Sequence, residues 1–279
     1  MKITPITREN LKYYKGFISA ADVTFIEEGY RLLPLGLVAD DLEGTGPMAA
    51  GALCIRPDEY ELRISSLYVS PAYRGRGAGR FLLDEAGRLF GGEDTELDIE
   101  FLIYGEEEER LAQFLEHCGF TFADPEYDVY MVTADEIRQT SLYGKSGKGI
   151  PFSSIDPDTF RHIQRTVEKR LLPAPSGGLG APGIDRDVSV MLAADYYPEA
   201  YTVVEKLTDR TLLLSSVYVN DSRPAMLLAL LTRTAALFTG KYPGDTRLLI
   251  QTVEEQGEKV IGQIFDDAES ISCRYRLAL

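Results

Sequence analysis

The stretch ISSLYVSPAYRGRGAGRFLLDEA, residues 64–86, joins a strand-like run to a helix-like run through a loop with three glycines. Apolar residues alternate with polar ones over 62–64 and again over 67–69, but the alternation changes phase across Ser65 and Ser66. A slip of this kind predicts a β-bulge, because an extra residue moves the following side chains to the opposite face of the sheet. The bulge would leave backbone groups available to a ligand or simply twist an edge strand.

The loop after this strand has the composition of a phosphate-binding turn. In PAYRGRGAGR, residues 71–80, the glycines permit positive φ, and a helix with apolar residues at 78, 82, 86 and 89 begins near Gly77. The first turn of a helix offers unpaired N–H groups at the positive end of its dipole. Arg74, Arg76 and Arg80 add guanidinium groups that suit phosphate oxygens.

The same strand pattern occurs twice in the chain. ISSLYV at 64–69 returns as LSSVYV at 214–219, TELDI at 95–99 as TRLLI at 246–250, and both halves close on a strand-like run, at 126–132 and 270–279. We therefore expect two copies of one domain, at 1–138 and 151–279, joined by a Gly-, Ser- and Lys-rich linker at 139–150.

The second copy lacks the glycine turn. It reads NDSRPAMLLA at 220–229, where Pro224 removes one N–H group and Met226 and Leu227 place side chains in the space that the glycines leave open. We expect this degenerate copy to pack on the first, to form a wall of its ligand site and to add stability rather than bind a phosphate. The Gly- and Pro-rich segment 173–183 is expected to be a surface loop, either covering the acceptor or disordered.

Composition restricts the class of protein. The 279 residues carry a formal charge of −15, which argues against a nucleic-acid partner, and contain only two histidines and three separated cysteines, so we expect no metal site. Residues 1–140 hold 13 Lys+Arg against 27 Asp+Glu, which favours a cationic ligand or is simply a solvated surface. No apolar stretch is long enough to span a membrane, and the N-terminal residues MKITPITREN show no export signal, so we expect a cytoplasmic protein.

Residues 64–86 resemble the GNAT superfamily of acyl-CoA-dependent N-acyltransferases, with its strand, R-x-x-G-x-G loop and helix. ERLAQFLEHCGFTF, residues 109–122, is similar to the family's next helix and strand. The resemblance implies an α+β (α/β layered) fold of two tandem domains. Each would have a mixed, mainly antiparallel twisted sheet, helices on both faces and a splayed, bulged central strand.

The resemblance also implies that coenzyme A lies in the gap opened by the bulge. Backbone of Leu67, Tyr68 and Val69 would follow the pantetheine, and the turn would bind the pyrophosphate. The cofactor-binding residues expected from it are Leu67, Tyr68, Val69, Arg74, Gly75, Arg76, Gly77, Ala78, Gly79 and Arg80.

The catalytic residues are less clearly marked. The N–H near Leu67 is expected to polarise the thioester carbonyl. Glu108 and Leu115 stand where the family often has Asn and a proton-donating Tyr, so Tyr104 or Tyr68 is a candidate acid, or the thiolate leaves unassisted. Glu61 is our expected base, with Glu59 on the same strand face; the alternative is that both are exposed edge charges.

These features predict an N-acetyltransferase that moves an acetyl group from acetyl-CoA to a primary amine of a small molecule or peptide, by direct attack in a ternary complex. The expected acceptor is cationic. The expected assembly is a monomer with an internal pseudo-dimer, or a homodimer. A non-catalytic acyl-CoA-binding or interaction protein is the alternative, and a third reading makes both copies structural.

Overall fold

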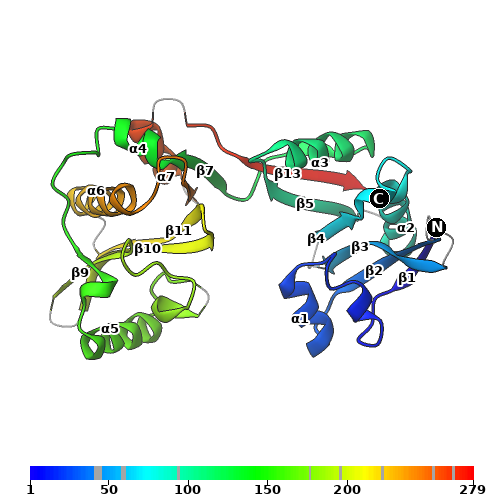
Figure 1. Ribbon diagram of the computed structural model, residues 1–279, viewed down its shortest axis with the longest axis horizontal. Coiled ribbons are helices and arrows are strands. Elements are labelled where there is room, and N and C mark those ends of the chain that lie inside the picture. The colour runs from blue at the N-terminus through cyan, green and yellow to red at the C-terminus, as the bar shows by residue number, and fades with distance from the viewer. Residues whose placement is uncertain are drawn as a thin grey trace. The chain divides into compact units, whose positions relative to one another are not determined.

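The computed structural model describes residues 1–40, 46–57, 61–92, 95–175, 177–194, 197–220, 223–252, 255–265 and 268–279. It divides into two compact units (Figure 1). Unit 1 comprises Met1–Pro125 and Cys273–Leu279, and unit 2 comprises Glu126–Ser272. Among the described residues, no helix has the length and hydropathy needed to cross a membrane.

Unit 1 is built on a sheet in the order β1-β2-β3-β4-β5-β13-β6. Its strands are β1 (Lys2–Pro5), β2 (Leu33–Asp40), β3 (Pro47–Pro57), β4 (Glu61–Val69), β5 (Glu96–Leu102), β6 (Thr121–Ala123) and β13 (Ser272–Ala278), and its helices are α1 (Ala20–Glu28), α2 (Ala78–Phe90) and α3 (Glu106–His117). Strands β1 to β4 pair antiparallel, whereas β4 and β5 are parallel.

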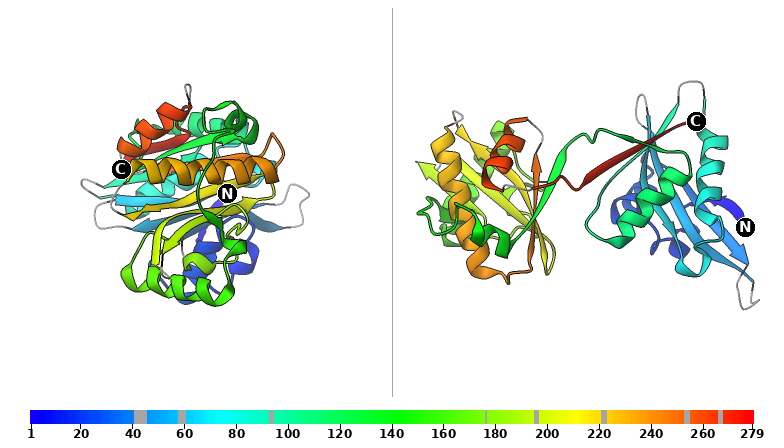
Figure 2. Two further views of the ribbon diagram at one scale, coloured as in Figure 1. Left: turned by 90° about the vertical axis from the view of Figure 1, so that its left-hand side faces the viewer. Right: turned by 90° about the horizontal axis from the view of Figure 1, so that it is seen from above.

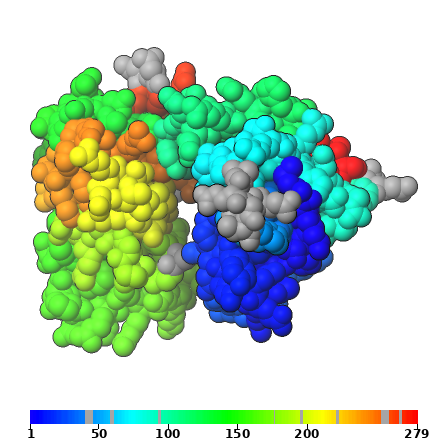
Figure 3. Space-filling model, turned by 45° about the vertical axis from the view of Figure 1, so that its right-hand side comes forward, coloured from blue at the N-terminus to red at the C-terminus, as the bar shows by residue number. Residues whose placement is uncertain are grey.

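Helices cover both faces of this sheet. On one face, α2 and α3 enclose the larger core, in which Leu82, Leu97 and Leu115 are fully buried. On the other face, the segment around α1 packs through Tyr14 and Ile26 onto Ala52 of β3. The surface of α1, drawn in blue, is visible in Figure 3. Helix α2 begins one residue after Gly77, as its spacing predicts, and Ala86 falls on its buried face.

Unit 2 repeats the architecture with the sheet order β7-β12-β11-β10-β9-β8. Its strands are β7 (Asp128–Thr133), β8 (Ile150–Pro151), β9 (Val190–Ala194), β10 (Tyr197–Thr208), β11 (Thr211–Val219) and β12 (Arg247–Thr252), and its helices are α4 (Ala134–Gln139), α5 (Pro157–Arg170), α6 (Pro224–Lys241) and α7 (Glu255–Ile264). Helix α6, in orange, lies across one face of this sheet (Figure 2), and α5 packs on the other through Phe160 and Ile163. The expected fold class, two mixed and mainly antiparallel sheets with helices on both faces, is confirmed.

The last strand of each copy pairs with the sheet of the other copy. β7, which closes the first half of the sequence, pairs antiparallel with β12 of unit 2 over Asp128–Thr133. β13, which closes the chain, lies between β5 and β6 of unit 1, and Figure 1 shows it in red beside β5. The division into units therefore differs from the expected boundaries at 138 and 151, because strand exchange places 126–138 in unit 2 and 273–279 in unit 1.

The expected linker, residues 139–150, lies within unit 2. Leu142 is buried in its core, and Lys148 N–H donates to the carbonyl oxygen of Ala229 at 3.0 Å. A Cβ built on Gly147 would lie 2.3 Å from the backbone nitrogen of Arg233, so the chain touches α6 here because glycine has no side chain. Close packing, rather than flexibility, accounts for this glycine.

The segment 173–183 is also packed where it is described. A short 3-10 helix at Gly178–Gly180 carries Leu179, which is 1% exposed and contacts the core around α5. Pro173 accepts a hydrogen bond from the Tyr201 hydroxyl at 2.6 Å. Ser176 is outside the described residues.

Candidate functional site

The predicted bulge in β4 is present. Cys54 of β3 pairs with Ser66, and the next residue, Ile55, pairs with Ile64, so Ser65 is the extra residue. The second copy has the same irregularity, because Val203 pairs with Ser216 and Val204 with Leu214. The phase change read from the sequence is therefore confirmed in both copies.

Beyond the bulge, the backbone groups of alternate residues of β4 face away from β3. Ser70 N–H donates to the carbonyl oxygen of Ala50 at 2.8 Å, and hydrogen-bonded pairs alternate along an antiparallel ladder. It follows that Tyr68 exchanges hydrogen bonds with β3, whereas Leu67 and Val69 turn their N–H and C=O groups to the opposite side. On that side β4 pairs with β5 only over Glu61–Arg63, so past the bulge the two strands separate.

The turn before α2 has the geometry expected of an anion seat. Gly75 and Gly77 have φ of +71° and +76°, and a Cβ on either would meet no atom within 4 Å, so the space above the turn is open. Gly77 is the N-cap of α2 and, as a glycine, it has no side chain that could accept a hydrogen bond from the first turn of the helix. The N–H groups in the first turn of a helix have no partner within the helix, so those of α2 are available to an anion at this end.

A cavity of about 610 Å³ lies between the end of β4, this turn and α3. Six of the predicted cofactor residues line it: Leu67, Tyr68, Val69, Arg74, Gly75 and Gly79. The other four, Arg76, Gly77, Ala78 and Arg80, belong to the adjoining turn and the start of α2. Of these, Ala78 is buried in the core and Arg80 lies 3.9 Å from Asp84 on the helix surface.

Arg74 crosses the cavity. Its Nε donates to the carbonyl oxygen of Val69 at 2.9 Å, its guanidinium lies 5.5 Å from the centre of the Tyr68 ring, and a terminal nitrogen is 3.5 Å from Glu107. The Val69 carbonyl is one of the groups that face away from β3, so Arg74 now holds a position that a ligand amide would need.

The α3 wall of the cavity was not among the expected binding residues. It consists of Glu107, Glu108, Arg110, Leu111 and Phe114. The helical spacing of residues 107, 111 and 114 was available in the sequence, but spacing alone does not say which face meets the glycine turn. Leu115, at the position of the family's proton donor, is fully buried in the core.

Gly79 has a steric role in this wall. A Cβ on Gly79 would lie 2.8 Å from Cζ of Phe114, so the glycine lets α2 and α3 approach each other at the cavity.

The three predicted catalytic positions lie apart. Leu67 lines the cavity. Tyr104 follows the end of β5 and is 49% exposed. Glu61 begins β4 and accepts hydrogen bonds from Arg63 at 2.9 Å and from Arg274 at 2.9 and 3.1 Å. Roles for Tyr104 and Glu61 stay predictions, and Glu59 is outside the described residues.

A buried carboxylate that sequence reasoning missed lies on the α1 side of the bulge. Asp22, with no exposed surface, accepts hydrogen bonds from the hydroxyls of Ser65 at 2.9 Å and Ser66 at 2.6 Å, and from Arg56 at 2.8 Å. Burial raises the pKa of this carboxyl, but the hydrogen bonds from Ser66, Arg56 and Ser65 together outweigh burial, so its pKa is lowered and it is ionised at neutral pH. A position in the first turn of α1 was its only local signal.

In unit 2 the corresponding helix entry is built differently. Pro224 stands in the first turn of α6 after Arg223, its N-cap. Met226 packs with Leu230 and Val190 rather than leaving a space like that above Gly77. The described part of this loop therefore has no open glycine turn, as predicted. Residues 221 and 222 are outside the described residues.

Comparison with known proteins finds a family match in the first half of the chain. Residues 36–122 match the model of the acetyltransferase (GNAT) domain. No curated protein matches the sequence. A solved tandem GNAT protein from the clavulanic acid biosynthesis pathway is 14% identical, with 99% of this chain and 98% of that chain aligned at a TM-score of 0.56, which shows the fold. A GCN5-related N-acetyltransferase from Kribbella flavida is 16% identical over 99% of this chain and 71% of that one, at a TM-score of 0.43.

Proposed function

We propose that unit 1 binds acetyl-CoA and transfers the acetyl group to a primary amine, because residues 36–122 match the GNAT acetyltransferase domain and the chain has a tandem GNAT fold. The observation that carries the proposal is the continuity of the cavity. It runs from an open, positively polarised turn to outward-facing backbone groups of a splayed strand. The turn suits a diphosphate, and the strand suits an extended chain with amide groups.

The residues present fit this co-substrate. In the proposed complex, N–H groups of the α2 start bind the diphosphate, and Arg74 leaves Val69 and Glu107 to pair with a phosphate oxygen. The N–H and C=O groups of Val69 are then available to pantetheine amides. Acetyl-CoA would supply the thioester: a bond from the amine nitrogen to its carbonyl carbon forms and the C–S bond breaks, which gives an amide and the thiolate of coenzyme A.

Leu67 is the residue we assign to this step. Its N–H is fixed by the β4 ladder and faces away from β3, so it can donate to the carbonyl oxygen as negative charge develops there, without reorganising. The attacking amine must first lose a proton, which at neutral pH costs about 4–5 kcal/mol for an ordinary amine. Glu61 remains the predicted acceptor of that proton and Tyr104 the predicted donor to the thiolate.

The acceptor we propose is a cationic amine of a small molecule or peptide. Support comes from the charge of residues 1–140, with 27 acidic against 13 basic side chains. We also propose a cytoplasmic protein that needs neither nucleic acid, membrane nor metal. The exchange of terminal strands between the two copies favours a monomer with an internal pseudo-dimer over a homodimer.

The second candidate function is acyl-CoA binding without catalysis. It is favoured by the absence of a proton-donating side chain at Leu115 and by the ion pairs that hold Glu61.

Two measurements separate these functions. Calorimetric titration with acetyl-CoA and with desulfo-CoA tests the site, and the absence of any binding would refute both functions. Release of free thiol from acetyl-CoA, followed across a panel of mono- and polyamines, then tests transfer. Binding without amine-dependent thiol release would favour the non-catalytic alternative.

A further inference from the structure

We propose that Arg274, from the last strand of the chain, is a positioning residue for the acyl-CoA site. Arg274 bridges Glu61 and Asp98 where β4 and β5 are still paired, at the closed end of the gap between these strands. This inference rests on the proposed binding of acyl-CoA in unit 1. It gives Glu61 a positioning role in place of its predicted role as the base, and a Glu61 variant below decides between the two.

The junction between β4 and β5 is short. The two strands pair over only three positions, from Glu61 opposite Glu96 to Arg63 opposite Asp98. Beyond them both strands continue, to Val69 and Leu102, and the cavity opens beside the far end of β4. The angle between the strands, and with it the width of the gap that the Leu67 and Val69 N–H groups face, is therefore set at this junction.

Carboxylates gather on one face of the junction. Side chains two apart on a strand share a face, so Glu96 and Asp98 of β5 stand beside Glu61 of β4. Asp98 has no exposed side-chain surface and Glu61 is 18% exposed. Three carboxylates this close repel one another unless cations compensate them.

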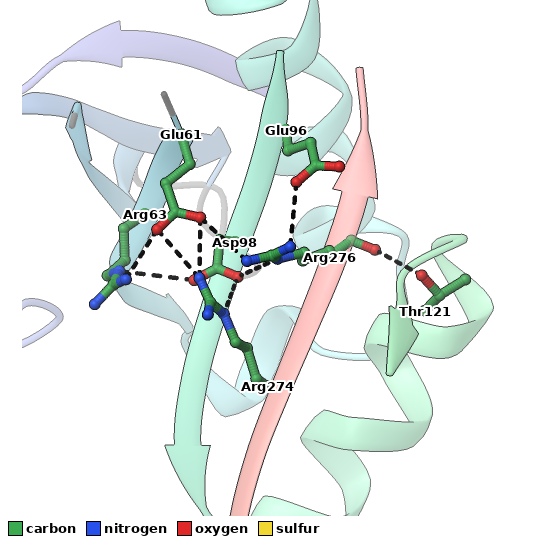
Figure 4. Close-up of polar contacts among 7 residues, drawn as sticks. All are labelled: Glu61, Arg63, Glu96, Asp98, Thr121, Arg274 and Arg276. Carbon is green, nitrogen blue, oxygen red and sulfur yellow. Dashed lines mark hydrogen bonds and ion pairs between the residues drawn. The ribbon is translucent and has the colours of Figure 1, made fainter. Parts of the chain in front are cut away.

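Strand β13 supplies most of the compensation (Figure 4). Arg274, whose side chain is 7% exposed, places Nε 2.6 Å from Asp98 and a terminal nitrogen 2.9 Å from Glu61. One rigid guanidinium thus joins the two strands at their point of divergence. Arg276 lies 3.3 Å from Asp98 and 3.6 Å from both Glu61 and Glu96, and Arg63 of β4 lies 2.9 Å from Glu61. The six charges sum to zero only when β13 is in place.

The second copy shows that the corresponding strands, β11 and β12, pair without such a cluster of charges. At the same junction, β11 has Thr211 and Leu213 where β4 has Glu61 and Arg63, and β12 has Leu249 where β5 has Asp98. The strand that pairs there with β12 is β7, which brings Met131 opposite Leu249. At these positions the second copy keeps one charge, Arg247 opposite Thr211, and no carboxylate, whereas the copy with the open glycine turn has the full cluster of charges.

This contrast indicates what the charges do. A buried ion pair is seldom more stabilising than well-packed apolar residues, and its best-attested use is to fix one geometry among several. Leucines would hold β4 and β5 together, but they would not determine their angle as a bidentate guanidinium does. The cluster also excludes the other terminal strand, because β7 carries no arginine over Asp128–Thr133 to neutralise Glu61 and Asp98.

The test is the affinity for acetyl-CoA, measured by calorimetry on the full chain, with circular dichroism to show that each variant is folded at the temperature used. For Arg274→Met we expect the dissociation constant to rise about threefold to thirtyfold, the range typical of coupling through a contact network. Arg274→Lys keeps the charge but not the two-pronged geometry, so we expect a smaller rise in the same direction. If Arg274→Met does not fold, the lysine variant decides the question.

Lys241→Met is the matched control. It breaks a comparable ion pair, in which Lys241 Nζ lies 2.7 Å from the buried carboxylate of Asp185 in unit 2. We expect it to lower the unfolding temperature while leaving the affinity for acetyl-CoA at the wild-type value. Wild-type affinity in a folded Arg274 variant, or an equal loss of affinity in Lys241→Met, would overturn the proposal.

Glu61→Gln separates positioning from base catalysis. A positioning role predicts a higher dissociation constant for acetyl-CoA and an unchanged shape of the pH profile of kcat. A fall in kcat with an altered pH profile and unchanged affinity would assign Glu61 as the base and refute the present role. If the wild-type protein binds no acetyl-CoA, the proposed function itself is refuted. If the wild-type protein and a folded Arg274 variant bind acetyl-CoA equally well, only the positioning role is refuted.

Discussion

Replacing Gly77 by glutamate is the most direct test of the anion seat. Gly77 has φ of +76°, and a Cβ there would point into open space. A side chain at this position therefore meets no steric obstacle, but it does incur the cost of a left-handed conformation, about 1–2 kcal/mol. We expect its carboxylate to extend toward the N–H groups of the first turn of α2, which begins at the next residue.

The electrostatic effect of this carboxylate on a bound diphosphate is larger. Two like charges about 5 Å apart at an effective dielectric constant near 20 repel by about 3 kcal/mol. That corresponds to a rise of at least about a hundredfold in the dissociation constant of acetyl-CoA. Gly77→Ala introduces the backbone strain without the charge, so we expect its effect on affinity to be several times smaller.

Gly144 provides a control in unit 2. Its φ is +78°, and a Cβ on it would likewise meet no atom within 4 Å. Gly144→Glu should therefore cost the same strain and a similar few degrees in unfolding temperature, yet leave acetyl-CoA binding unchanged. Calorimetry gives the affinities and differential scanning fluorimetry the stabilities. If Gly77→Glu binds acetyl-CoA as tightly as Gly144→Glu, the pyrophosphate is not at this turn and the reasoning fails.

Three further experiments test buried groups near the bulge and the packing of the expected linker in unit 2. Asp22→Asn should lower the free energy of unfolding by about 1–3 kcal/mol at pH 7. Because the pKa of Asp22 is lowered in the folded state, this difference from wild type should shrink as the pH falls below about 4 through the folded-state pKa. Urea denaturation measures the difference, and a value that does not depend on pH would contradict the prediction. Gly147→Ala should destabilise by about 1–3 kcal/mol, since its Cβ would meet the backbone of Arg233 at 2.3 Å, whereas a flexible linker would tolerate the alanine. Cys54 is fully buried, and burial raises the pKa of its thiol to about 12, so a disulfide reagent should leave it unmodified in the native protein and modify it in urea.

Features encoded by neighbouring residues were predictable from the sequence. The bulge at Ser65 follows from a change of phase in a period-two pattern, and the start of α2 after Gly77 follows from glycine conformation and helical spacing. The repeat at 214–219 made the second bulge predictable in the same way. Both the bulged strand and the turn that follows it are thus encoded locally.

Contacts between distant residues required the tertiary structure. Arg274 lies 213 positions from Glu61, and Asp22 lies 43 positions from Ser65. The two terminal strands were recognised as strands, but nothing in their alternation says that each pairs with the other copy's sheet, because a strand's local pattern fixes its buried face and not its neighbour. Only the assembled sheet decides which carboxylates are paired with arginines, and that the arginines at Glu61 and Asp98 come in part from the last strand of the chain.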